Sequence, residues 1–237
     1  MVAAWKSIGT RGEPLSETPK IRWVPCSVSP KRSGARSSAA CARASLISTY
    51  SPLYRTAPSL VSSEEREALR LEASRLSGDA RTNERYGFQL VDGVQLLSPA
   101  RNRSVADGDV RCNLHTLTLV DRLLALLGRH VKAIVSSYLY YGRDDFLGLH
   151  IDQRLCQLTV LVLLDGDAGP LILHPELCDI PGESLLRYSQ EHWGHPPGGT
   201  AVHLQDGPLV LQGALIPHHR PPHKGDGEIT LAAFCYL

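Results

Sequence analysis

The hydrophobic positions of the chain follow a helical period in two stretches. The first opens at Ser62-Ser63-Glu64-Glu65, where a serine followed three residues later by a glutamate is the signature of a capping box. It closes at Gly78, a residue type that often ends a helix. The second runs from about Leu117 to His130 and places its apolar side chains on one face. The pattern predicts two amphipathic helices, with apolar positions Leu69, Leu71, Ala73 and Leu76 in the first and Leu117, Val120, Leu124 and Leu127 in the second.

Strand-like segments occupy much of the rest of the chain. Residues 87–97 are expected to form two short strands around the turn-forming pair Asp92-Gly93, followed by a polar loop from Ser98 to Asp109. Apolar and β-branched runs, separated by glycine, proline and aspartate, predict further strands at Ala133–Tyr141, Leu158–Leu164, Leu171–His174, Ala201–Leu204, Leu209–Leu215 and Glu228–Tyr236. Helices followed by many short strands indicate an α+β, mainly β fold, with helices packed on an antiparallel β-sandwich or jelly roll.

The first 45 residues differ from the remainder in composition. They are rich in Ser, Pro, Lys and Arg and show no sustained periodicity. They hold eight Lys/Arg and two Asp/Glu, so they carry +6 while the remainder carries −5 of a formal net charge of +1. Such a segment buries too little apolar surface to offset its ordering entropy. We expect a disordered extension over 1–45 and a single domain over 46–237.

Composition excludes several classes of partner. The 237 residues are 43% hydrophobic and 21% charged, which is typical of a globular protein, and the net charge of +1 gives no basic field for nucleic acid. No apolar run approaches the roughly 20 residues of a membrane span, and the N-terminus has no apolar signal core. The six cysteines form no CxxC pair, which favours reduced thiols. We expect a cytoplasmic protein without nucleic-acid or membrane partners; the sequence carries no signal for an oligomeric state.

Two histidine-containing motifs carry the candidate chemistry. The segment Tyr141–Asp152 ends in His150-Ile-Asp152, and in an extended chain residues two apart face the same side. Much later, Pro217-His218-His219 follows an apolar strand, and one more strand remains. Two imidazoles and one carboxylate would make a face that binds Fe(II) and leaves positions open for a co-substrate and O₂. The other histidines fit no ligand spacing with this pair and are expected to be surface or structural: His115, His130, His174, His192, His195, His203 and His223.

With these motifs in place, the stretch from about Ser136 to Leu237 resembles the catalytic core of the 2-oxoglutarate/Fe(II) oxygenase superfamily, especially its prolyl-hydroxylase-like branch. The resemblance implies a double-stranded β-helix with supporting N-terminal helices and a catalytic core over about 133–237. It also implies Fe(II), 2-oxoglutarate and O₂ as cofactors. The implied catalytic and metal ligands are His150, Asp152 and His218. His219 is the alternative distal ligand; His218 is preferred because it directly follows Pro217, as in that branch.

The sequence departs from the family at the 2-oxoglutarate anchor. The family places an arginine or lysine on the last strand, where this chain has Gly227 and Glu228. A carboxylate cannot receive the distal carboxylate of 2-oxoglutarate, so another cation is needed. Arg220 shares the strand face of His218 and offers a bidentate fork, and Lys224 is the next option. Two further co-substrate contacts are expected from the side chains of Tyr141 and Thr159.

The sequence therefore predicts a 2-oxoglutarate- and Fe(II)-dependent dioxygenase. Because Asp152 fills the carboxylate position and vacates no ligand site, hydroxylation or desaturation is favoured over halogenation. The lack of a basic, aromatic-rich surface or an added recognition domain favours a small-molecule substrate, such as an amino acid or a biosynthetic intermediate. Two alternatives stay open: a non-catalytic β-sandwich binding protein, supported by Glu228 at the anchor position, and a cupin-like metal hydrolase or isomerase.

Overall fold

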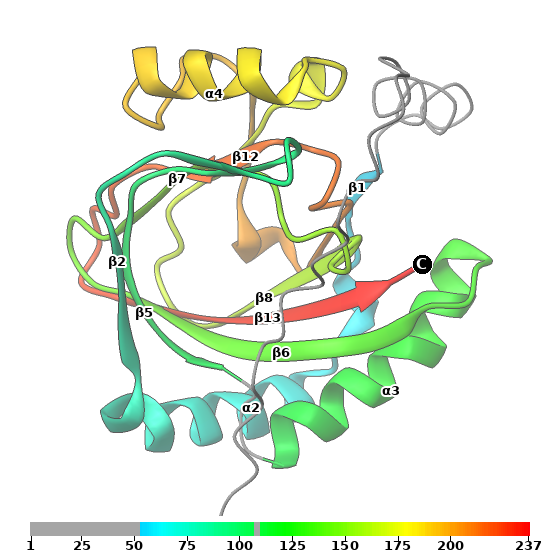
Figure 1. Ribbon diagram of the computed structural model, residues 1–237. Helices are drawn as coiled ribbons and strands as arrows, with labels where there is room; N and C mark the ends of the chain where they lie inside the picture. Colours follow the sequence, from blue (N-terminus) through cyan, green and yellow to red (C-terminus); the bar gives the residue numbers. More distant parts are fainter. Residues whose placement is uncertain (1–52, 107–109) are drawn as a thin grey trace, which may run out of the picture. The chain divides into compact units, whose positions relative to one another are not determined.

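The computed structural model describes residues 53–106 and 110–237, so the expectation for residues 1–45 lies outside the described part. Its main feature is one curled antiparallel sheet (Figure 1), which has 11 strands and is accompanied by a separate two-stranded hairpin. The strands of the large sheet are β1 (Tyr54–Thr56), β2 (Arg81–Arg85), β5 (Ala100–Ala106), β6 (Lys132–Tyr141), β7 (Phe146–His150), β8 (Leu158–Gly166), β9 (Leu171–Leu173), β10 (Thr200–Val202), β11 (Leu209–Leu211), β12 (His218–Arg220) and β13 (Glu228–Tyr236).

The sheet folds into two facing walls. Strands β1, β11, β8, β13 and β6 form the major wall, and β7, β12, β9 and β10 form the minor wall. Strand β5 joins the walls, because Arg103–Ala106 pair with β6 while Ala100 and Arg101 pair with β7. Strand β2 lies beside β5, and the two close one side of the sheet in Figure 1. This is the jelly-roll arrangement predicted from the sequence, and it brings β7 and β12 together.

Helices cover the outer faces of both walls. Figure 1 shows α2 (Ser63–Leu76) and α3 (Val110–Leu127) beneath the major wall and α4 (Gly182–Glu191) above the minor wall. The predicted capping box is present, since Ser62 Oγ accepts from the Glu65 amide and the Glu65 carboxylate accepts from the Ser62 amide. Buried phenols attach α2 to β6, as Tyr138 Oη donates to Glu72 (2.8 Å) and Tyr140 Oη donates to the Ala73 carbonyl (2.7 Å).

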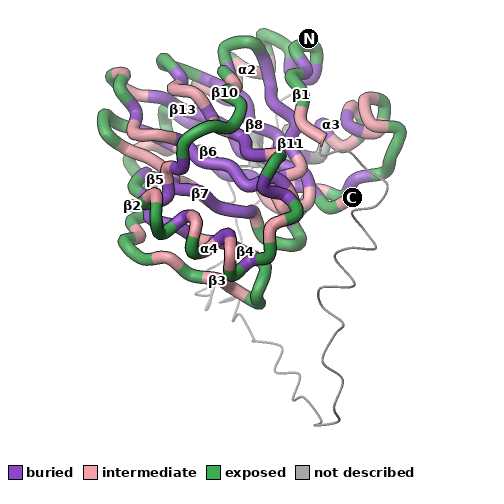
Figure 2. The backbone as a smooth tube through the Cα atoms, turned by 90° about the horizontal axis from the view of Figure 1, so that it is seen from above, coloured by how far each residue is buried: buried purple, intermediate pink, exposed green. Residues whose placement is uncertain are grey.

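Alternation along the central strands separates two apolar layers. On β8, the even-numbered residues from Leu158 to Leu164 pack toward α2 and α3, whereas Leu161 and Leu163 face between the walls. Strand β8 is therefore buried on both faces, which explains its unbroken apolar run. Figure 2 shows buried residues along the central strands and exposed residues in the loops that join them. The same alternation turns Thr159 of β8 and Ala232 of β13 toward the space between the walls.

The hairpin predicted within 87–97 is confirmed as β3 (Gln89–Val91) and β4 (Gln95–Leu97), with both turn residues, Asp92 and Gly93, at positive φ. The polar loop predicted from Ser98 to Asp109 is wrong for Ala100–Ala106, which form β5; residues 107–109 are outside the described part. The sequence pattern did not reveal this strand, because its pairing is made by the backbone and the charged side chains of Arg101 and Arg103 are exposed to solvent. The short 3-10 segments are Pro58–Leu60, Ser77–Asp79, Pro175–Leu177 and Leu204–Asp206.

Other element boundaries also shift. The second helix begins at Val110 rather than near Leu117 and ends at Leu127, where Gly128 takes a positive φ. The strand predicted over Leu209–Leu215 ends at Leu211, because the Leu215 and Ile216 amides bond back to the Gln212 carbonyl in a turn. Within the described residues, no helix is long and apolar enough to cross a membrane.

Candidate active site

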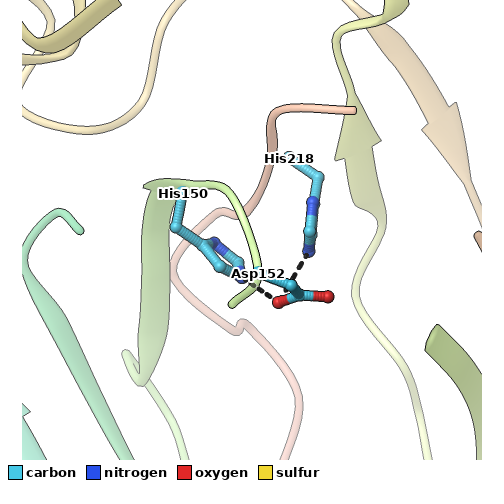
Figure 3. Close-up of side chains that lie close together, drawn as sticks. All are labelled: His150, Asp152 and His218. Atoms are coloured by element: carbon cyan, nitrogen blue, oxygen red, sulfur yellow. Dashed lines mark ion pairs between the residues drawn. The ribbon is translucent and has the colours of Figure 1, made fainter. Parts of the chain in front are cut away.

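His150, Asp152 and His218 come together where β7 and β12 pair, with His150 and His218 in register. Figure 3 shows both imidazoles directed at the Asp152 carboxylate. The Oδ1 atom of Asp152 lies 3.6 Å from His150 Nε2 and 3.9 Å from His218 Nε2, and one potential ligand atom of each residue lies within 4.8 Å of the others. These are the three residues singled out from the sequence.

Backbone carbonyls fix the orientation of both imidazoles. His150 Nδ1 lies 3.0 Å from the Gly148 carbonyl, and His218 Nδ1 lies 2.8 Å from the Ile216 carbonyl. A carbonyl only accepts, so each Nδ1 carries the proton and each Nε2 keeps a lone pair directed at the shared space. This arrangement of the second nitrogen is characteristic of metal-binding histidines.

The protonation behaviour of His150 agrees with that geometry. Burial lowers the pKa of His150 well below its usual value; the neighbouring His218 and Arg85 lower it further, whereas the hydrogen bond to Gly148 opposes the shift. The imidazole is therefore neutral at physiological pH, which is the form that donates a lone pair to a cation.

Asp152 is held from the opposite side by Thr159. Thr159 Oγ1 donates a 2.5 Å hydrogen bond to Oδ2, which leaves Oδ1 as the oxygen that faces the histidines. The Asp152 amide also donates to the Gly213 carbonyl (3.0 Å). The sequence analysis expected Thr159 to contact a co-substrate; in the structure its hydroxyl is bound to the carboxylate of the triad.

His219 turns away from this cluster. Its Nδ1 lies 3.2 Å from Nε2 of His174, the two rings stack, and His195 packs edge-on against His219. Burial lowers the pKa of His219 to about 3, with smaller contributions from its histidine neighbours. Of the two histidines left open by the sequence, His218 is therefore the one that lies with His150 and Asp152.

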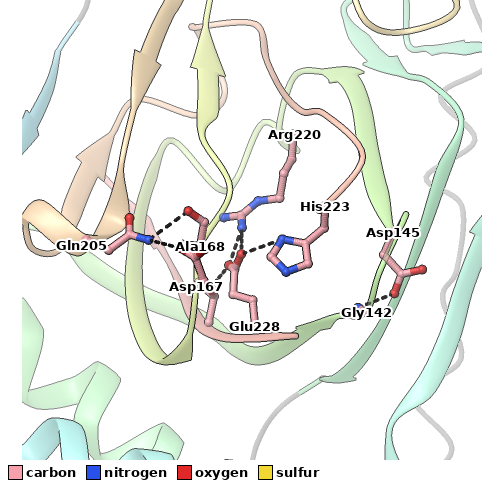
Figure 4. A network of polar contacts seen from close by, with 9 residues as sticks. Gly142, Asp145, Asp167, Ala168, Gln205, Arg220, His223 and Glu228 are labelled. Atoms are coloured by element: carbon pink, nitrogen blue, oxygen red, sulfur yellow. Dashed lines mark hydrogen bonds and ion pairs between the residues drawn. The ribbon is translucent and has the colours of Figure 1, made fainter. Parts of the chain in front are cut away.

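Arg220 and Glu228 form a buried ion pair further along the same interior. Arg220 Nη1 donates to both carboxylate oxygens of Glu228 (Figure 4). Thr230 Oγ1 donates to Oε1 of the same carboxylate. Arg220 is 2% exposed and Glu228 is 3% exposed. Tyr141 pairs with Glu228 in the strand register, and the Arg220 guanidinium lies 4.6 Å from the centre of its ring. Burial raises the pKa of the Tyr141 phenol, against the opposing effect of Arg220.

The structure thus brings Arg220 and Tyr141 together but leaves Lys224 apart. The Lys224 side chain is 82% exposed, and its ammonium lies 3.7 Å from Asp144 on the turn after β6.

Nothing in the sequence indicated two other residues near the site. His223 packs beside Glu228, and Arg85, on β2, donates from Nε to the Ser98 carbonyl (2.6 Å). Neither position lies in an apolar or motif-like stretch, so no sequence signal marked it.

Compared by sequence, the chain matches no family model and none of the curated proteins. Comparison of structures does find similar proteins. A prolyl-4-hydroxylase from Pseudomonas putida matches with a TM-score of 0.50 and 11% identity, over 83% of this chain and 98% of that one. The non-heme α-ketoglutarate-dependent epimerase SnoN from nogalamycin biosynthesis matches with a TM-score of 0.53 and 18% identity, over 83% of each chain.

A third match is HygX from Streptomyces hygroscopicus, whose structure contains nickel, 2-oxoglutarate and hygromycin B. It has a TM-score of 0.53 and 16% identity, over 82% of this chain and 86% of HygX. The chain has the fold of the 2-oxoglutarate/Fe(II) oxygenases. The predicted double-stranded β-helix is confirmed, and within this oxygenase fold the His-Asp-His cluster occupies the paired ends of β7 and β12.

Proposed function

We propose that this protein is a 2-oxoglutarate- and Fe(II)-dependent oxygenase. The observation that carries the proposal is the triad of His150, Asp152 and His218. All three potential ligand atoms face one space, both imidazoles are oriented by backbone carbonyls, and Thr159 aligns the carboxylate. Two imidazoles and one carboxylate form the facial set that non-heme Fe(II) oxygenases use. The residues present therefore fit the metal that the fold implies.

In this proposal the residues have separate tasks. His150 Nε2, Asp152 Oδ1 and His218 Nε2 would hold the iron. The bound iron supplies the oxidative chemistry, in which 2-oxoglutarate and O₂ are consumed and succinate and CO₂ are released. Arg220 provides positive charge for the distal carboxylate of 2-oxoglutarate, and Tyr141 lies against the same guanidinium. Apolar side chains of β8 and β13 line the space between the walls and limit water there.

For Arg220, the contacts with Glu228 leave part of the guanidinium for a ligand. Both hydrogen bonds that Arg220 donates to Glu228 leave from Nη1, so Nε and Nη2 are the nitrogens that remain for a carboxylate. Arg220 follows His218 by two residues on β12, which places its side chain on the strand face of the triad. This supports Arg220, and not the exposed Lys224, as the co-substrate anchor.

We further propose that the reaction is hydroxylation of a small molecule, such as an amino acid or a biosynthetic intermediate. Asp152 supports hydroxylation over halogenation, because the carboxylate occupies its ligand position. Proteins of the same fold include an epimerase and a carbocyclase, so the fold alone does not select among oxidative outcomes. The small-molecule substrate and the cytoplasmic location stay predictions from the sequence.

A non-catalytic binding protein of this fold is the second candidate, and the ion pair favours it. Glu228 already neutralises Arg220, so the interior offers a dicarboxylate less net positive charge than an unpaired arginine would. A cupin-like hydrolase or isomerase would instead use the same triad with another divalent metal.

One measurement separates these candidates. Purified protein is reconstituted anaerobically with Fe(II), Zn(II) or Mn(II), then exposed to O₂ and 2-oxoglutarate, and succinate is quantified with and without candidate substrates. If the protein is an oxygenase, succinate should form with Fe(II) but not with Zn(II) or Mn(II). The Asp152→Ala variant should form no succinate. Absence of succinate under all conditions, with metal bound, would reject the oxygenase and favour the binding protein. Product analysis by mass spectrometry then distinguishes a gain of one oxygen atom from epimerisation or ring closure.

A further inference from the structure

Glu228 creates an electrostatic problem at the proposed anchor. It stands on β13 with its carboxylate bound to Arg220 Nη1 and Thr230 Oγ1, and it is 3% exposed. The distal carboxylate of 2-oxoglutarate would add a second negative charge beside the same guanidinium. Two carboxylates against one cation leave an uncompensated buried charge, which is costly in a partly dry interior. A second positive charge is therefore needed when the co-substrate binds.

His223 is placed to provide that charge. Its Nδ1 atom lies 4.0 Å from Glu228 Oε2, and Figure 4 shows its ring beside the Arg220–Glu228 pair. The residue is 2% exposed, and neither Nδ1 nor Nε2 has a hydrogen-bond partner within the described part of the chain. Buried polar atoms are nearly always paired, so an imidazole with both nitrogens unpaired needs an explanation.

The backbone around His223 holds the ring in this position. The His223 amide donates to the Asp145 carbonyl, and the His223 carbonyl accepts from the Asp144 amide, both at 2.8 Å. Two glycines flank the ring: a Cβ on Gly225 would lie 2.9 Å from Nε2, and one on Gly169 would lie 3.5 Å from Nδ1. The ring is thus anchored through its own main chain and enclosed, while its nitrogens stay unused.

The other acids on the elements around His223 are already engaged. Asp145 accepts from the Gly142 amide and from Arg101. Asp144 lies 3.7 Å from Lys224, and Asp167, which follows β8, accepts from Gln205. The charged groups on the neighbouring strands are Arg220 of β12 and Glu228 of β13, with the phenol of Tyr141 on β6. Glu228 is therefore the carboxylate with which a protonated His223 would pair.

We propose that His223 becomes protonated when 2-oxoglutarate binds and then pairs with Glu228, so that Arg220 is freed for the distal carboxylate. This inference rests on the proposed function and deepens it. In the bound state Arg220 and His223 carry two positive charges against Glu228 and the ligand carboxylate. A small shift of the ring converts the 4.0 Å separation into a charge-assisted hydrogen bond. His223 is thus a positioning residue that acts through Glu228, and binding takes up one proton.

Proton uptake is measured by calorimetry on the full chain loaded anaerobically with Fe(II). Binding of 2-oxoglutarate is titrated near pH 7.5 in buffers of different ionisation enthalpy, and the dissociation constant is followed from pH 6 to 9. The unmodified protein should take up close to one proton, with a dissociation constant that rises up to tenfold per pH unit in the alkaline range. Oxalate, which chelates metal but has no distal carboxylate, should bind without this uptake.

Three variants test which residue takes up the proton when 2-oxoglutarate binds. His223→Gln should bind 2-oxoglutarate more weakly at pH 6, with no proton uptake and a flat pH profile. The matched control His203→Gln, at an exposed histidine, should keep the proton uptake and the pH dependence of the unmodified protein. Glu228→Gln should remove the uptake and retain affinity at pH 9, because Arg220 is then free at every pH. If the unmodified protein takes up no proton when 2-oxoglutarate binds, the inference is overturned and the oxygenase proposal stands. Failure of the unmodified, iron-loaded protein to bind 2-oxoglutarate at any pH overturns both.

Discussion

Gly213 lies directly against the carboxylate of Asp152. A Cβ atom on residue 213 would overlap Oδ2 of Asp152 and come within 2.6 Å of Oγ1 of Thr159. The two backbones are joined as well, since the Asp152 amide donates to the Gly213 carbonyl. The position of the carboxylate in the triad therefore depends on the absence of a side chain on a segment that is remote in sequence.

Substituting Gly213 should weaken metal binding without unfolding the protein. In Gly213→Ala the new methyl group displaces the Asp152 carboxylate and breaks its hydrogen bond with Thr159. We expect at least a tenfold loss of Fe(II) affinity, measured by anaerobic titration, with a near-native circular dichroism spectrum. Gly87→Ala is the matched control, because a Cβ there meets nothing within 4 Å. Unchanged iron affinity in Gly213→Ala would show that Asp152 is not a ligand in this orientation.

Alanine at the triad itself should remove the metal. His150→Ala, Asp152→Ala and His218→Ala each leave two ligands, so we expect less than a tenth of the parent iron content after reconstitution. His219→Ala is the matched control, since its ring bonds to His174 instead. Iron content by inductively coupled plasma spectrometry checks this. Loss of iron in His219→Ala with retention in His218→Ala would reassign the distal ligand.

Thr159 should affect the metal through Asp152. Thr159→Val keeps the shape of the side chain and removes the 2.5 Å hydrogen bond to Oδ2. Partners of metal ligands commonly contribute about 10- to 100-fold to metal affinity, so we expect a loss in that range. Thr159→Ser should restore most of the affinity. A Thr159→Val variant with parental iron affinity and an altered 2-oxoglutarate KM would instead make Thr159 a direct co-substrate contact.

Arg220 should control the use of 2-oxoglutarate. Arg220→Ala removes the proposed anchor, and we expect the 2-oxoglutarate KM to rise at least tenfold, equivalent to about 1.4 kcal/mol. Arg220→Lys should recover only part of this, because the bidentate fork is lost. Lys224→Ala, at an exposed position, should change KM little. Steady-state succinate formation measures all three variants, and the reverse ranking of Arg220 and Lys224 would move the anchor to the turn after β12.

The buried pair also predicts a pattern of stability. Arg220→Ala leaves Glu228 without its cation, and breaking a buried ion pair costs about 3–5 kcal/mol. Replacing both residues, as in Arg220→Met with Glu228→Leu, removes both charges and should recover most of that loss. Urea denaturation measures the free energy of unfolding of the single variant and of the double variant. A double variant as unstable as the single one would show that the charge itself is not the cause. The double variant also tests KM in a stable protein without the anchor.

The sequence predicted the parts of this molecule that carry strong local signals. The capping box at Ser62, the Asp92-Gly93 hairpin and the last strand, Glu228–Tyr236, all lie where expected. The triad was predicted because His-x-Asp and the later Pro-His stand in an order, among glycine turns and apolar strands, that resembles the catalytic core of the oxygenase superfamily. The fold class followed from the order of helices and strands.

The sequence did not reveal contacts made between remote segments. Strand β5 reads as a polar loop because its stability comes from pairing with β2 along one edge and with β6 and then β7 along the other. Helix α4, over Gly182–Glu191, has few strong helix signals and lies against the β3–β4 hairpin. Likewise, nothing in the local pattern indicates that Glu228 binds Arg220 or that Gly213 makes room for Asp152.

The ends of the large sheet bear on the solubility of the protein. Within the described residues, the sheet terminates in β1 and β10, each of three residues, and in β2, whose outward side chains include charged groups. An unpaired strand edge is a template on which a second chain can add, and proteins limit this by keeping edges short or charged. In the order of the sheet, the long apolar strands β8 and β13 are paired on both sides, between β11 and β6. Opening at β5 would unpair the edges of β6 and β7 and uncover the apolar face that β8 and β13 turn toward the minor wall, so aggregation on heating should begin with separation of the walls.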